Sequence, residues 1–526
     1  MSSSKEFSTL RTFFWPIHKV ELKKFVPMLL IFFLICFNYN ILKASKDAMV
    51  VTARSSGAEA IPFIKVWAIL PFALLMTLLF TRLSNKLSRE KIFYVMMSLF
   101  LGFFLIFTFV LYPLQDTLHP HTLADKLQEV LPLGFKGLIA MFRNWIFTIF
   151  YIMAEMWSTI MMTVLFWGFA NEVTSVKDAK RFYGLLGVGA NLACIISGLV
   201  SSILSHHTFN ASLPFGTDAW GQSVVFLNCI VILSGILCIY LFRRLHKQGF
   251  GYNSIQEDGT SLREPSKIKM GLRKNFAYLA KSKYLICIAV IVIMYNIVIN
   301  LVEVVWKDQV KELYPNPSDF NAYMGQVMTA VGVIATLTSL FISGNLIRKF
   351  SWTTTAMISP VILLVTSVGF FSFLLFRDFG FAHAIAGILG FSPLAISVFF
   401  GSMQNSLARA SKYTVFDATK ELAFVPLNQE SKLKGKAAID GVGSRLGKSG
   451  GSLIHQSLLM VFGTVSLSTP YVATILLVAI GAWVIAVKSL GKQFTQLTSP
   501  TDTPKPQDRE DTPVFEPTLA ISKTST

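Results

Sequence analysis

Long apolar stretches separated by short polar loops run through almost the whole chain. Twelve of them have 18 or more residues, which is enough for a helix to cross the roughly 30 Å hydrocarbon core of a bilayer. The pattern therefore predicts an all-α membrane protein with twelve transmembrane helices. The predicted spans lie at 25–45, 61–81, 92–112, 138–171, 182–204, 222–242, 284–306, 323–347, 353–376, 381–408, 437–463 and 468–488.

Three short matches between the two halves of the chain are separated by nearly the same number of residues. Gly187-Val188-Gly189 returns as Gly441-Val442-Gly443, 254 positions later; Lys46-Asp47 returns as Lys307-Asp308, 261 positions later; and Asn85 matches Asn345, 260 positions later. These separations indicate that a six-helix half was duplicated. Secondary transporters commonly have such pseudo-symmetric halves and hold their substrate between them near the bilayer midplane.

The duplication and the loops divide the chain into four predicted segments. These are an N-terminal six-helix half at 1–242, a basic cytoplasmic linker at 243–283, a C-terminal six-helix half at 284–490, and a Pro- and Thr-rich disordered tail at 491–526. Alternate loops carry most of the net charge of +18. The positive-inside rule then places both termini in the cytoplasm. Because this rule explains the charge, we expect no nucleic-acid partner.

Several ionisable side chains fall inside the apolar spans, where each costs about 2.5–3.5 kcal/mol on insertion scales. Such a concentration favours a polar site between helices over a bundle sealed by apolar packing. Glu155, flanked by apolar residues deep in the fourth span, suggests a functional or coupling role. The candidates are Lys43, Lys46, Asp47, Lys65, Arg143, Glu155, Glu303, Lys307, Asp308, Arg409, Asp440, Arg445, Lys448 and His455.

Each candidate also has a simpler interpretation. The Lys46-Asp47 and Lys307-Asp308 pairs sit late in their spans and fit interfacial groups whose side chains reach the headgroups. Glu303 precedes Lys307 by four residues, a spacing that allows a local ion pair on one helical face. The charges of the eleventh span fit a salt bridge between helices.

No motif or ligand pattern indicates an enzyme, a metal site or a cofactor. The five cysteines all lie in apolar spans without metal-ligand spacing. Leu446-Gly447-Lys448-Ser449 ends like a phosphate-binding loop, but Val442 stands where that motif needs glycine. His119 and His121 lack catalytic partners nearby in the sequence.

At several of these places the chain resembles the nucleotide transporter family of plastids and obligate intracellular bacteria. The resembling segments cover almost everything except the tail. They are Phe37-Asn38-Tyr39-Asn40-Ile41-Leu42 leading into Lys46-Asp47, Gly57-Ala58-Glu59-Ala60-Ile61-Pro62-Phe63-Ile64-Lys65, Phe166-Trp167-Gly168-Phe169-Ala170-Asn171, Val302-Glu303-Val304-Val305-Trp306-Lys307, Lys432-Leu433-Lys434-Gly435-Lys436, and Leu446-Gly447-Lys448-Ser449-Gly450-Gly451.

The resemblance implies a major-facilitator-like fold and ATP/ADP translocation across a bacterial inner membrane. Separately, we expect a monomer surrounded by membrane lipids. The resemblance assigns transport to Lys46, Glu155 and Glu303, and to either Lys436 or Lys448. Two departures, Ala44 in place of a family carboxylate and Ser444-Arg445 in place of Asn-Pro, leave open a proton-coupled import of several nucleoside triphosphates. A major-facilitator permease for another solute is a more remote alternative.

The resulting hypothesis places the substrate phosphates among cations from both halves. Lys46, Lys307, Arg445 and Lys448 are the expected phosphate contacts, because multiply charged phosphates favour several cationic donors. The expected coupling candidates are Asp47, Glu155, Glu303 and Asp440. For the base we expect an aromatic contact from Tyr39, Trp157 or Trp306.

Overall fold

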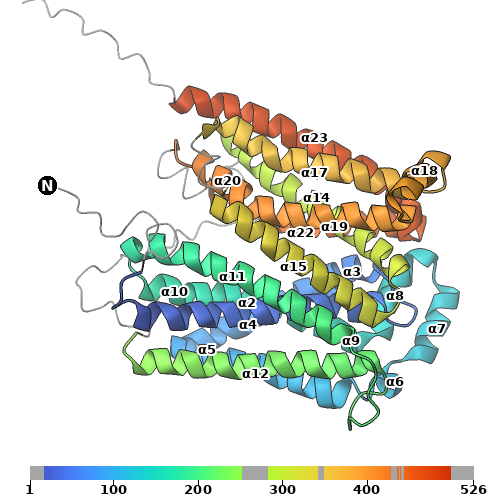
Figure 1. Ribbon diagram of the computed structural model, residues 1–526, viewed down its shortest axis with the longest axis horizontal. Coiled ribbons are helices and arrows are strands. Elements are labelled where there is room, and N and C mark those ends of the chain that lie inside the picture. Colours follow the sequence, from blue (N-terminus) through green and yellow to red (C-terminus); the bar gives the residue numbers. More distant parts are fainter. Residues whose placement is uncertain are drawn as a thin grey trace, which may run out of the picture.

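Helices form all the regular secondary structure in the described part of the computed structural model, which covers residues 17–250, 282–341, 349–427, 435–436, 439 and 443–498. Long helices run side by side along one axis (Figure 1). We call the end at which Lys247 finishes α12 and Lys283 begins α14 the linker end, and the opposite end the far end. Predicted residues Asp440 and Asn345 lie outside the described residues.

The helices of the N-terminal half gather in the lower part of Figure 1. Its fourth span is continuous but changes from α-helix to π-helix and back. The elements are α2 (Leu22–Val51), α3 (Ala60–Phe63), η1 (Ile64–Ile69), α4 (Leu70–Lys86), α5 (Arg89–Ile106), η2 (Phe107–Leu111), α6 (Gln115–Leu118), α7 (His121–Val130), η3 (Leu133–Phe135), α8 (Lys136–Arg143), α9 (Trp145–Trp157), η4 (Ser158–Phe166), α10 (Trp167–Val173), α11 (Val176–Ser205) and α12 (Ala219–Lys247).

The helices of the C-terminal half occupy the upper part of the same view. Several helices in both halves begin at a side-chain cap, in which Ser88, Asp218 or Ser351 accepts the backbone N–H three residues later. The elements of this half are α14 (Lys283–Leu313), α15 (Pro317–Phe341), α17 (Trp352–Leu375), α18 (Gly380–Leu389), α19 (Pro393–Ser411), η6 (Lys412–Phe416), α20 (Asp417–Ala423), α22 (Ser444–Phe462) and α23 (Val465–Thr498).

Ten helices of the described residues are long and apolar enough to cross a membrane, so the predicted count of twelve is not fully met. The predicted tenth span corresponds to α18 and the helix after it, which are bent by 77° at a break and raise the count to eleven if taken as one span. The predicted eleventh span is helical over Ser444–Phe462. It differs from the others because Arg445, Lys448 and His455 make it too polar for a lipid-facing helix.

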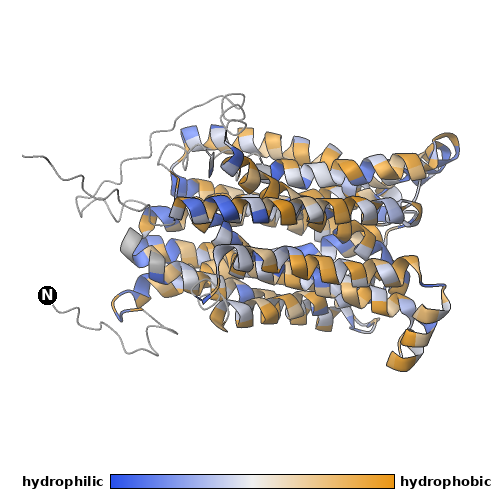
Figure 2. Ribbon diagram, turned by 90° about the horizontal axis from the view of Figure 1, so that it is seen from above, coloured by the Kyte–Doolittle hydropathy of each residue, from blue (hydrophilic) through white to orange (hydrophobic). Residues whose placement is uncertain are grey.

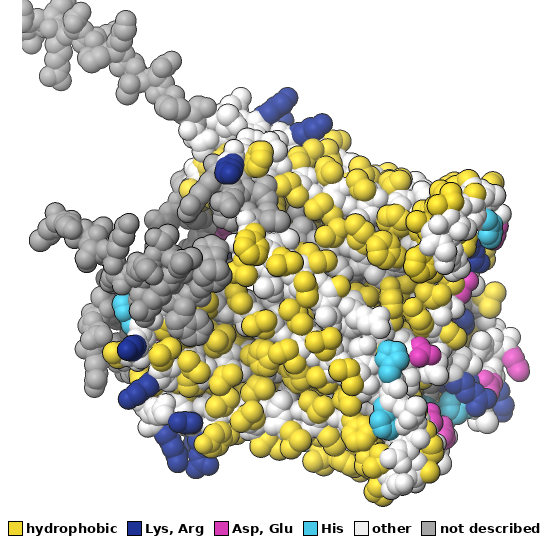
Figure 3. Space-filling view, viewed as in Figure 1, with side chains coloured by type: hydrophobic (Ala, Val, Ile, Leu, Met, Phe, Trp, Pro, Cys, Tyr) yellow, Lys and Arg dark blue, Asp and Glu magenta, His cyan; other side chains and the backbone are white. Residues whose placement is uncertain are grey.

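The outer surface has the apolar character that a lipid environment requires. Hydrophobic residues dominate the middle of the bundle in Figure 2, and a broad hydrophobic face separates two more polar ends in Figure 3. Leu233, Val365 and Val478 are among the exposed large apolar side chains. Contiguous exposed apolar surface of this kind marks a membrane contact rather than a surface in water.

Both fourth spans contain a π-helical segment at equivalent positions. In the N-terminal half η4 begins at Ser158, and in the C-terminal half η6 begins at Lys412, which is 254 positions later. The same separation relates Gly187 to Gly441 in the sequence. π-helical segments are rare in proteins overall, and those that occur are often found at functional sites. Their matched placement therefore supports the duplication.

The two halves meet along α11 and α15, where glycines bring the backbones together. A Cβ atom added at Gly198 would lie 2.5 Å from the carbonyl oxygen of Gly325, and one added at Gly332 would lie 2.9 Å from that of Asn191. Nearer the far end, the Asn321 amide donates to the Ser205 hydroxyl at 2.7 Å. Small residues therefore set the spacing of the halves, as they do in other membrane helix pairs.

We expect G198A to destabilise the protein, because the added methyl group must push the α15 backbone away. Overpacking of this kind typically costs about 1–3 kcal/mol. G184A on the same helix is the matched control, since a Cβ atom there meets nothing within 4 Å. Thermal unfolding of both variants in detergent measures the difference. Equal unfolding midpoints would contradict the close packing of α11 on α15.

Candidate functional site

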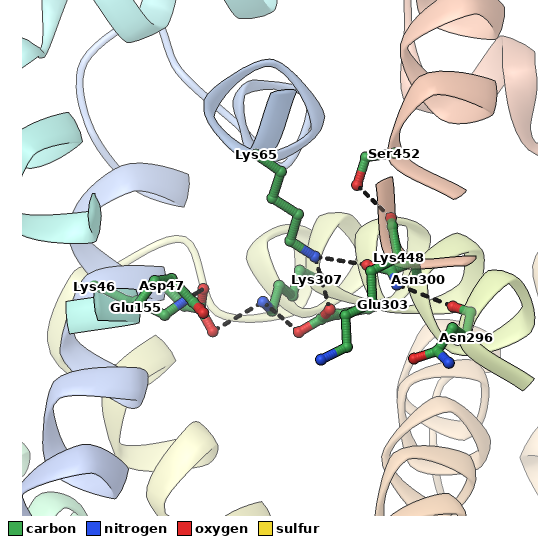
Figure 4. Close-up of polar contacts among 10 residues, drawn as sticks. All are labelled: Lys46, Asp47, Lys65, Glu155, Asn296, Asn300, Glu303, Lys307, Lys448 and Ser452. Carbon is green, nitrogen blue, oxygen red and sulfur yellow. Dashed lines mark hydrogen bonds and ion pairs between the residues drawn. The ribbon is translucent and has the colours of Figure 1, made fainter. Parts of the chain in front are cut away.

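Six charged side chains of alternating sign form one continuous chain between the two halves (Figure 4). We call this chain the ion-pair network. Four of its members come from α2, η1 and α9 of the N-terminal half, and two come from α14 of the C-terminal half. In order, they are Glu155, Lys46, Asp47, Lys307, Glu303 and Lys65.

Asp47 is the centre of the ion-pair network, because it binds both lysines of the duplicated motif. Its Oδ1 lies 3.0 Å from Lys46 Nζ, and its Oδ2 lies 2.8 Å from Lys307 Nζ. The two lysines are 261 positions apart in the sequence and belong to opposite halves. A single carboxylate therefore holds the halves together at equivalent points.

Two glutamates and a third lysine extend the network on either side. Glu155 Oε1 lies 3.0 Å from Lys46 Nζ. Glu303 accepts from Lys307 at 2.9 Å and from Lys65 at 3.1 Å, so it also joins the halves. Lys65 donates in addition to Asn300 Oδ1 at 2.9 Å. Each charge is thus adjacent to a charge of the opposite sign.

Burial differs along the network in a way that suggests which members can move. The side chains of Lys46, Asp47 and Lys307 are 2%, 0% and 1% exposed, whereas that of Glu155 is 27% exposed. Glu303 retains 15% exposure. Buried ions require partners because desolvation costs several kcal/mol per ion. The centre must stay paired, while the two glutamates can exchange a lysine for water.

The local helix geometry explains how these side chains come together. Glu303 and Lys307 lie one turn apart on α14, which confirms the predicted local ion pair. Lys65 lies within η1, and Glu155 precedes η4 by three residues. Tyr151, one turn before Glu155, places its ring 3.5 Å from Lys46 Nζ, a cation–π contact.

The predicted cations of the eleventh-span region are not members of the ion-pair network, and they differ in their surroundings. Lys436 is exposed and pairs with Glu421, outside the network. Arg445 and Lys448 lie on an exposed face of α22. Gly447, the residue before Lys448, packs against α14, because a Cβ atom added at Gly447 would lie 2.7 Å from Asn296 Cβ. Of the two lysines that the family resemblance left open, Lys448 is therefore the one on a helix that packs against α14, which carries Glu303 and Lys307.

Two of the three predicted base contacts, Trp157 and Trp306, are occupied by packing within their own halves in this structure. Trp157 is fully buried and donates its indole N–H to the Ile35 carbonyl at 3.0 Å. Trp306 is 1% exposed and donates to the Ser402 hydroxyl at 3.0 Å. Both rings pack inside their own half, where each satisfies its only donor. Tyr39 is half-buried and stays a prediction.

Lys65, Tyr151 and Asn300 belong to the site but are not among the residues predicted to bind substrate or couple transport, although Lys65 is among the charges noted in the spans. Lys65 had a usable signal, because it stands alone three residues after Pro62 within an apolar span. Tyr151 and Asn300 had no such signal in the sequence, because an uncharged side chain inside an apolar span is most simply explained by packing between helices. Their roles depend on which helices become neighbours.

The described residues hold no group of three or more His, Cys, Asp or Glu side chains placed to bind a metal ion. Among the histidines, His119 and His121 lie near α6 and α7 at the far end, with ring centroids 5.6 Å apart. Burial, together with the neighbouring His121, lowers the pKa of His119 to about 4. Its ring is therefore neutral at pH 7.

Comparisons with known proteins agree with this geometry. The sequence profile of the TLC ATP/ADP transporter family matches residues 1–494. ADP,ATP carrier protein 1 of Chlamydia trachomatis serovar D is 45% identical over 493 residues, covering 94% of this chain and 93% of that carrier. ADP,ATP carrier protein 2, chloroplastic, of Arabidopsis thaliana is 42% identical over 516 residues, covering 96% and 82%.

A solved structure shows the same fold at low sequence identity. The crystal structure of a D-xylose-proton symporter matches with a TM-score of 0.51 at 13% identity, covering 89% of this chain and 97% of that one. At this identity the likeness concerns the fold alone. It confirms the predicted major-facilitator-like architecture.

We expect D47N to destabilise the folded protein more than any exposed charge neutralisation. The change leaves Lys46 and Lys307 buried with one fewer anion, and breaking a buried pair typically costs about 3–5 kcal/mol. The control is E172Q, which removes the exposed pair with Arg89 and should cost less than about 1 kcal/mol. Unfolding of both variants in detergent provides the measurement, and equal stabilities would contradict the central role of Asp47.

Proposed function

This chain belongs to the TLC ATP/ADP transporter family, and from that premise we propose that it exchanges ATP for ADP across a bacterial inner membrane by alternating access. Alternating access moves two halves about a shared binding site. The ion-pair network supports this proposal, because Asp47 contacts Lys46 of one half and Lys307 of the other. That contact is the observation on which the proposal depends.

The charge of the network limits how a nucleotide can bind. Its three lysines and three carboxylates cancel, so the closed network offers no net attraction for phosphates. The phosphates must therefore replace carboxylates on the lysines. Arg445 and Lys448 on the exposed face of α22 supply additional positive charge.

Glu155 and Glu303 are suited to neutralise the lysines when no substrate phosphate is bound. Each retains contact with solvent and can be hydrated when a phosphate takes its place on Lys46 or Lys307. Asp47 is fully buried and stays in position. Substrate binding then exchanges one set of charge-assisted hydrogen bonds for another, which avoids leaving a lysine unpaired.

This arrangement explains exchange rather than uniport. Without substrate, the network ties the halves together and holds the empty carrier in one state. A bound nucleotide displaces Glu303 from its lysines and so removes the Glu303–Lys65 contact between the halves, which loosens the tie while Asp47 keeps its lysines. Uniport of about four negative charges against 100 mV costs roughly 9 kcal/mol, whereas exchange of ATP for ADP transfers about one charge and costs about 2.3 kcal/mol.

A proton-coupled import of several nucleoside triphosphates is the alternative. It requires a carboxylate that is free to take up a proton. Among the described residues, Asp47, Glu155 and Glu303 are each engaged by a lysine. The remaining coupling candidate, Asp440, lies outside the described residues. The ion pairs therefore favour exchange, and a permease for another solute has no use for so many cations.

Membrane orientation and assembly complete the proposal. Both termini and the segment at 243–283 lie in the cytoplasm, because the basic loops alternate along the chain. The boundaries at 1–242, 284–490 and 491–526 follow the predicted halves and tail. A monomer in lipid suffices, since one copy of the chain contributes cations from both halves.

The proposal is tested by uptake of labelled ATP, GTP and UTP into proteoliposomes. We expect uptake to require internal ADP and to favour adenine. Uptake into empty vesicles that follows an inward proton gradient would instead establish the proton-coupled alternative. Folded protein without nucleotide uptake under either condition would refute nucleotide transport.

Within the same assay, we expect K307Q to lower exchange by at least about tenfold, because a charge-assisted phosphate contact is typically worth 1.5–3 kcal/mol. D47N/K307Q removes opposite charges together, so it should recover stability without recovering exchange. The control is K86Q, which neutralises an exposed lysine at the end of α4. Full exchange by D47N/K307Q would show that Lys307 serves only to hold the fold.

A further inference from the structure

His455 is a buried histidine on α22 that takes no part in the ion-pair network. It is 0% exposed, and neither its Nδ1 nor its Nε2 has a hydrogen-bond partner among the described residues. Four other histidines have one buried nitrogen without such a partner, whereas His455 has two. Buried polar groups are nearly always hydrogen-bonded, because burial without a partner costs free energy. An imidazole with both nitrogens unpaired therefore points to a partner that is present in another state of the protein.

The register of α22 on α14 locates His455 along the bundle. Gly447 meets Asn296, and four residues later Gly451 meets Asn300, where an added Cβ atom would lie 2.9 Å from Asn300 Cβ. The two helices therefore run in the same direction and in step. His455 follows Gly451 by one further turn, on nearly the same face of α22.

At this level the two helices reach the place where the halves meet. The turn of α14 after Asn300 carries Glu303, a member of the ion-pair network. Lys65 of the N-terminal half donates to Asn300 Oδ1 at 2.9 Å (Figure 4). Asn300 therefore meets Gly451 of α22 as well as Lys65 of η1. His455 lies one turn farther along the same junction.

Elements of the opposite half cover α22 around this junction. Besides α14 and α23 of its own half, α22 packs against α3, η1 and η3 of the N-terminal half. Toward the far end, a Cβ atom added at Gly134 of η3 would lie 2.6 Å from the carbonyl oxygen of Met460 on α22. Lys311 of α14 donates to the Ser56 carbonyl, which also joins the halves there. Separation of the halves at the far end removes these neighbours and so uncovers His455.

We propose that His455 binds the nucleoside part of the nucleotide, its base or ribose, in the state that is open at the far end. This binding role rests on the proposed function for its ligand and adds a contact that the ion-pair network does not supply. Phosphate oxygens only accept hydrogen bonds, whereas a base and a ribose both donate and accept them. A neutral imidazole likewise has one donor and one acceptor. The nucleoside pairs the imidazole, while the phosphates stay with the lysines.

ATP binding to purified protein in lipid nanodiscs tests this role without transport. The rise of the unfolding midpoint with ATP concentration gives the half-saturating concentration. We expect H455L to raise that concentration about three- to tenfold, the usual effect of losing one uncharged hydrogen bond. The midpoint without nucleotide should not fall, because the imidazole has no hydrogen bond to lose in the closed state. H455Q keeps a donor and an acceptor, and should bind ATP more tightly than H455L.

Inorganic tripolyphosphate distinguishes the nucleoside from the phosphates, because it lacks base and ribose. We expect its half-saturating concentration to be the same for H455L and the unsubstituted protein. An equal weakening of ATP and tripolyphosphate would overturn the assignment to the nucleoside.

Ser201 on α11 provides the matched control. It precedes His455 by 254 positions, the same separation as between Gly187 and Gly441. Its buried hydroxyl also has no partner among the described residues, but a Cβ atom added at Gly325 of α15 would lie 3.2 Å from Ser201 Cβ. Because Ser201 is enclosed by the close packing of α11 on α15, S201A should leave ATP binding unchanged.

A disulfide at the far end tests the state in which His455 binds. Asn321 donates to the Ser205 hydroxyl at 2.7 Å between α15 and α11, so S205C/N321C brings two thiols together there. Oxidation by copper phenanthroline, confirmed by mass spectrometry, then holds that end closed. We expect H455L to weaken ATP binding in the reduced protein and to have no effect in the oxidised protein. An effect of equal size in both forms would overturn the assignment to the state open at the far end.

Unchanged ATP binding in H455L would overturn the binding role altogether. A lower midpoint of nucleotide-free H455L and H455Q, with ATP binding unchanged, would assign His455 to packing instead. Failure of the proposed function gives a different result, because the unsubstituted protein would then show no rise of the midpoint with ATP. Failure of the His455 assignment leaves that rise intact.

Discussion

Burial of charge between two helical halves is the constraint on which the rest of this structure depends. Lys46, Asp47 and Lys307 are almost completely removed from solvent, and each persists as an ion only because an opposite charge touches it. The small residues of α11 and α15 keep the halves close enough for that contact. Packing and charge pairing are therefore mutually dependent, and a change in either alters the other.

The fold was largely readable from the sequence, because a bilayer allows few structures. Long apolar runs must be helices there, since a backbone in lipid has to satisfy its own hydrogen bonds. The limit appeared at the eleventh span, where Arg445 and Lys448 lie on an exposed face and His455 is buried against protein. Hydropathy reports how well a helix suits contact with lipid. It therefore gives too low a score to a membrane helix that carries several polar side chains.

The candidate site was only partly readable. Charges inside spans are costly, so Lys46, Glu155, Glu303 and Lys307 were visible from their positions. Their pairing was not, because Asp47 reaches Lys307 only after the two halves have packed. The surroundings of the aromatic candidates were hidden for a related reason: Trp157 and Trp306 donate to acceptors within their own halves. Residue type alone does not tell an internal anchor from a ligand contact.

The matched π-helical segments at Ser158 and Lys412 bear on the ancestry of the chain. A π-helical turn arises when one residue is added to an α-helix, and such additions are uncommon. Two independent additions at equivalent places would be a coincidence. The simpler history is one addition in an ancestral six-helix protein, before its gene was copied and fused. The irregular fourth helix would then be older than the transporter itself.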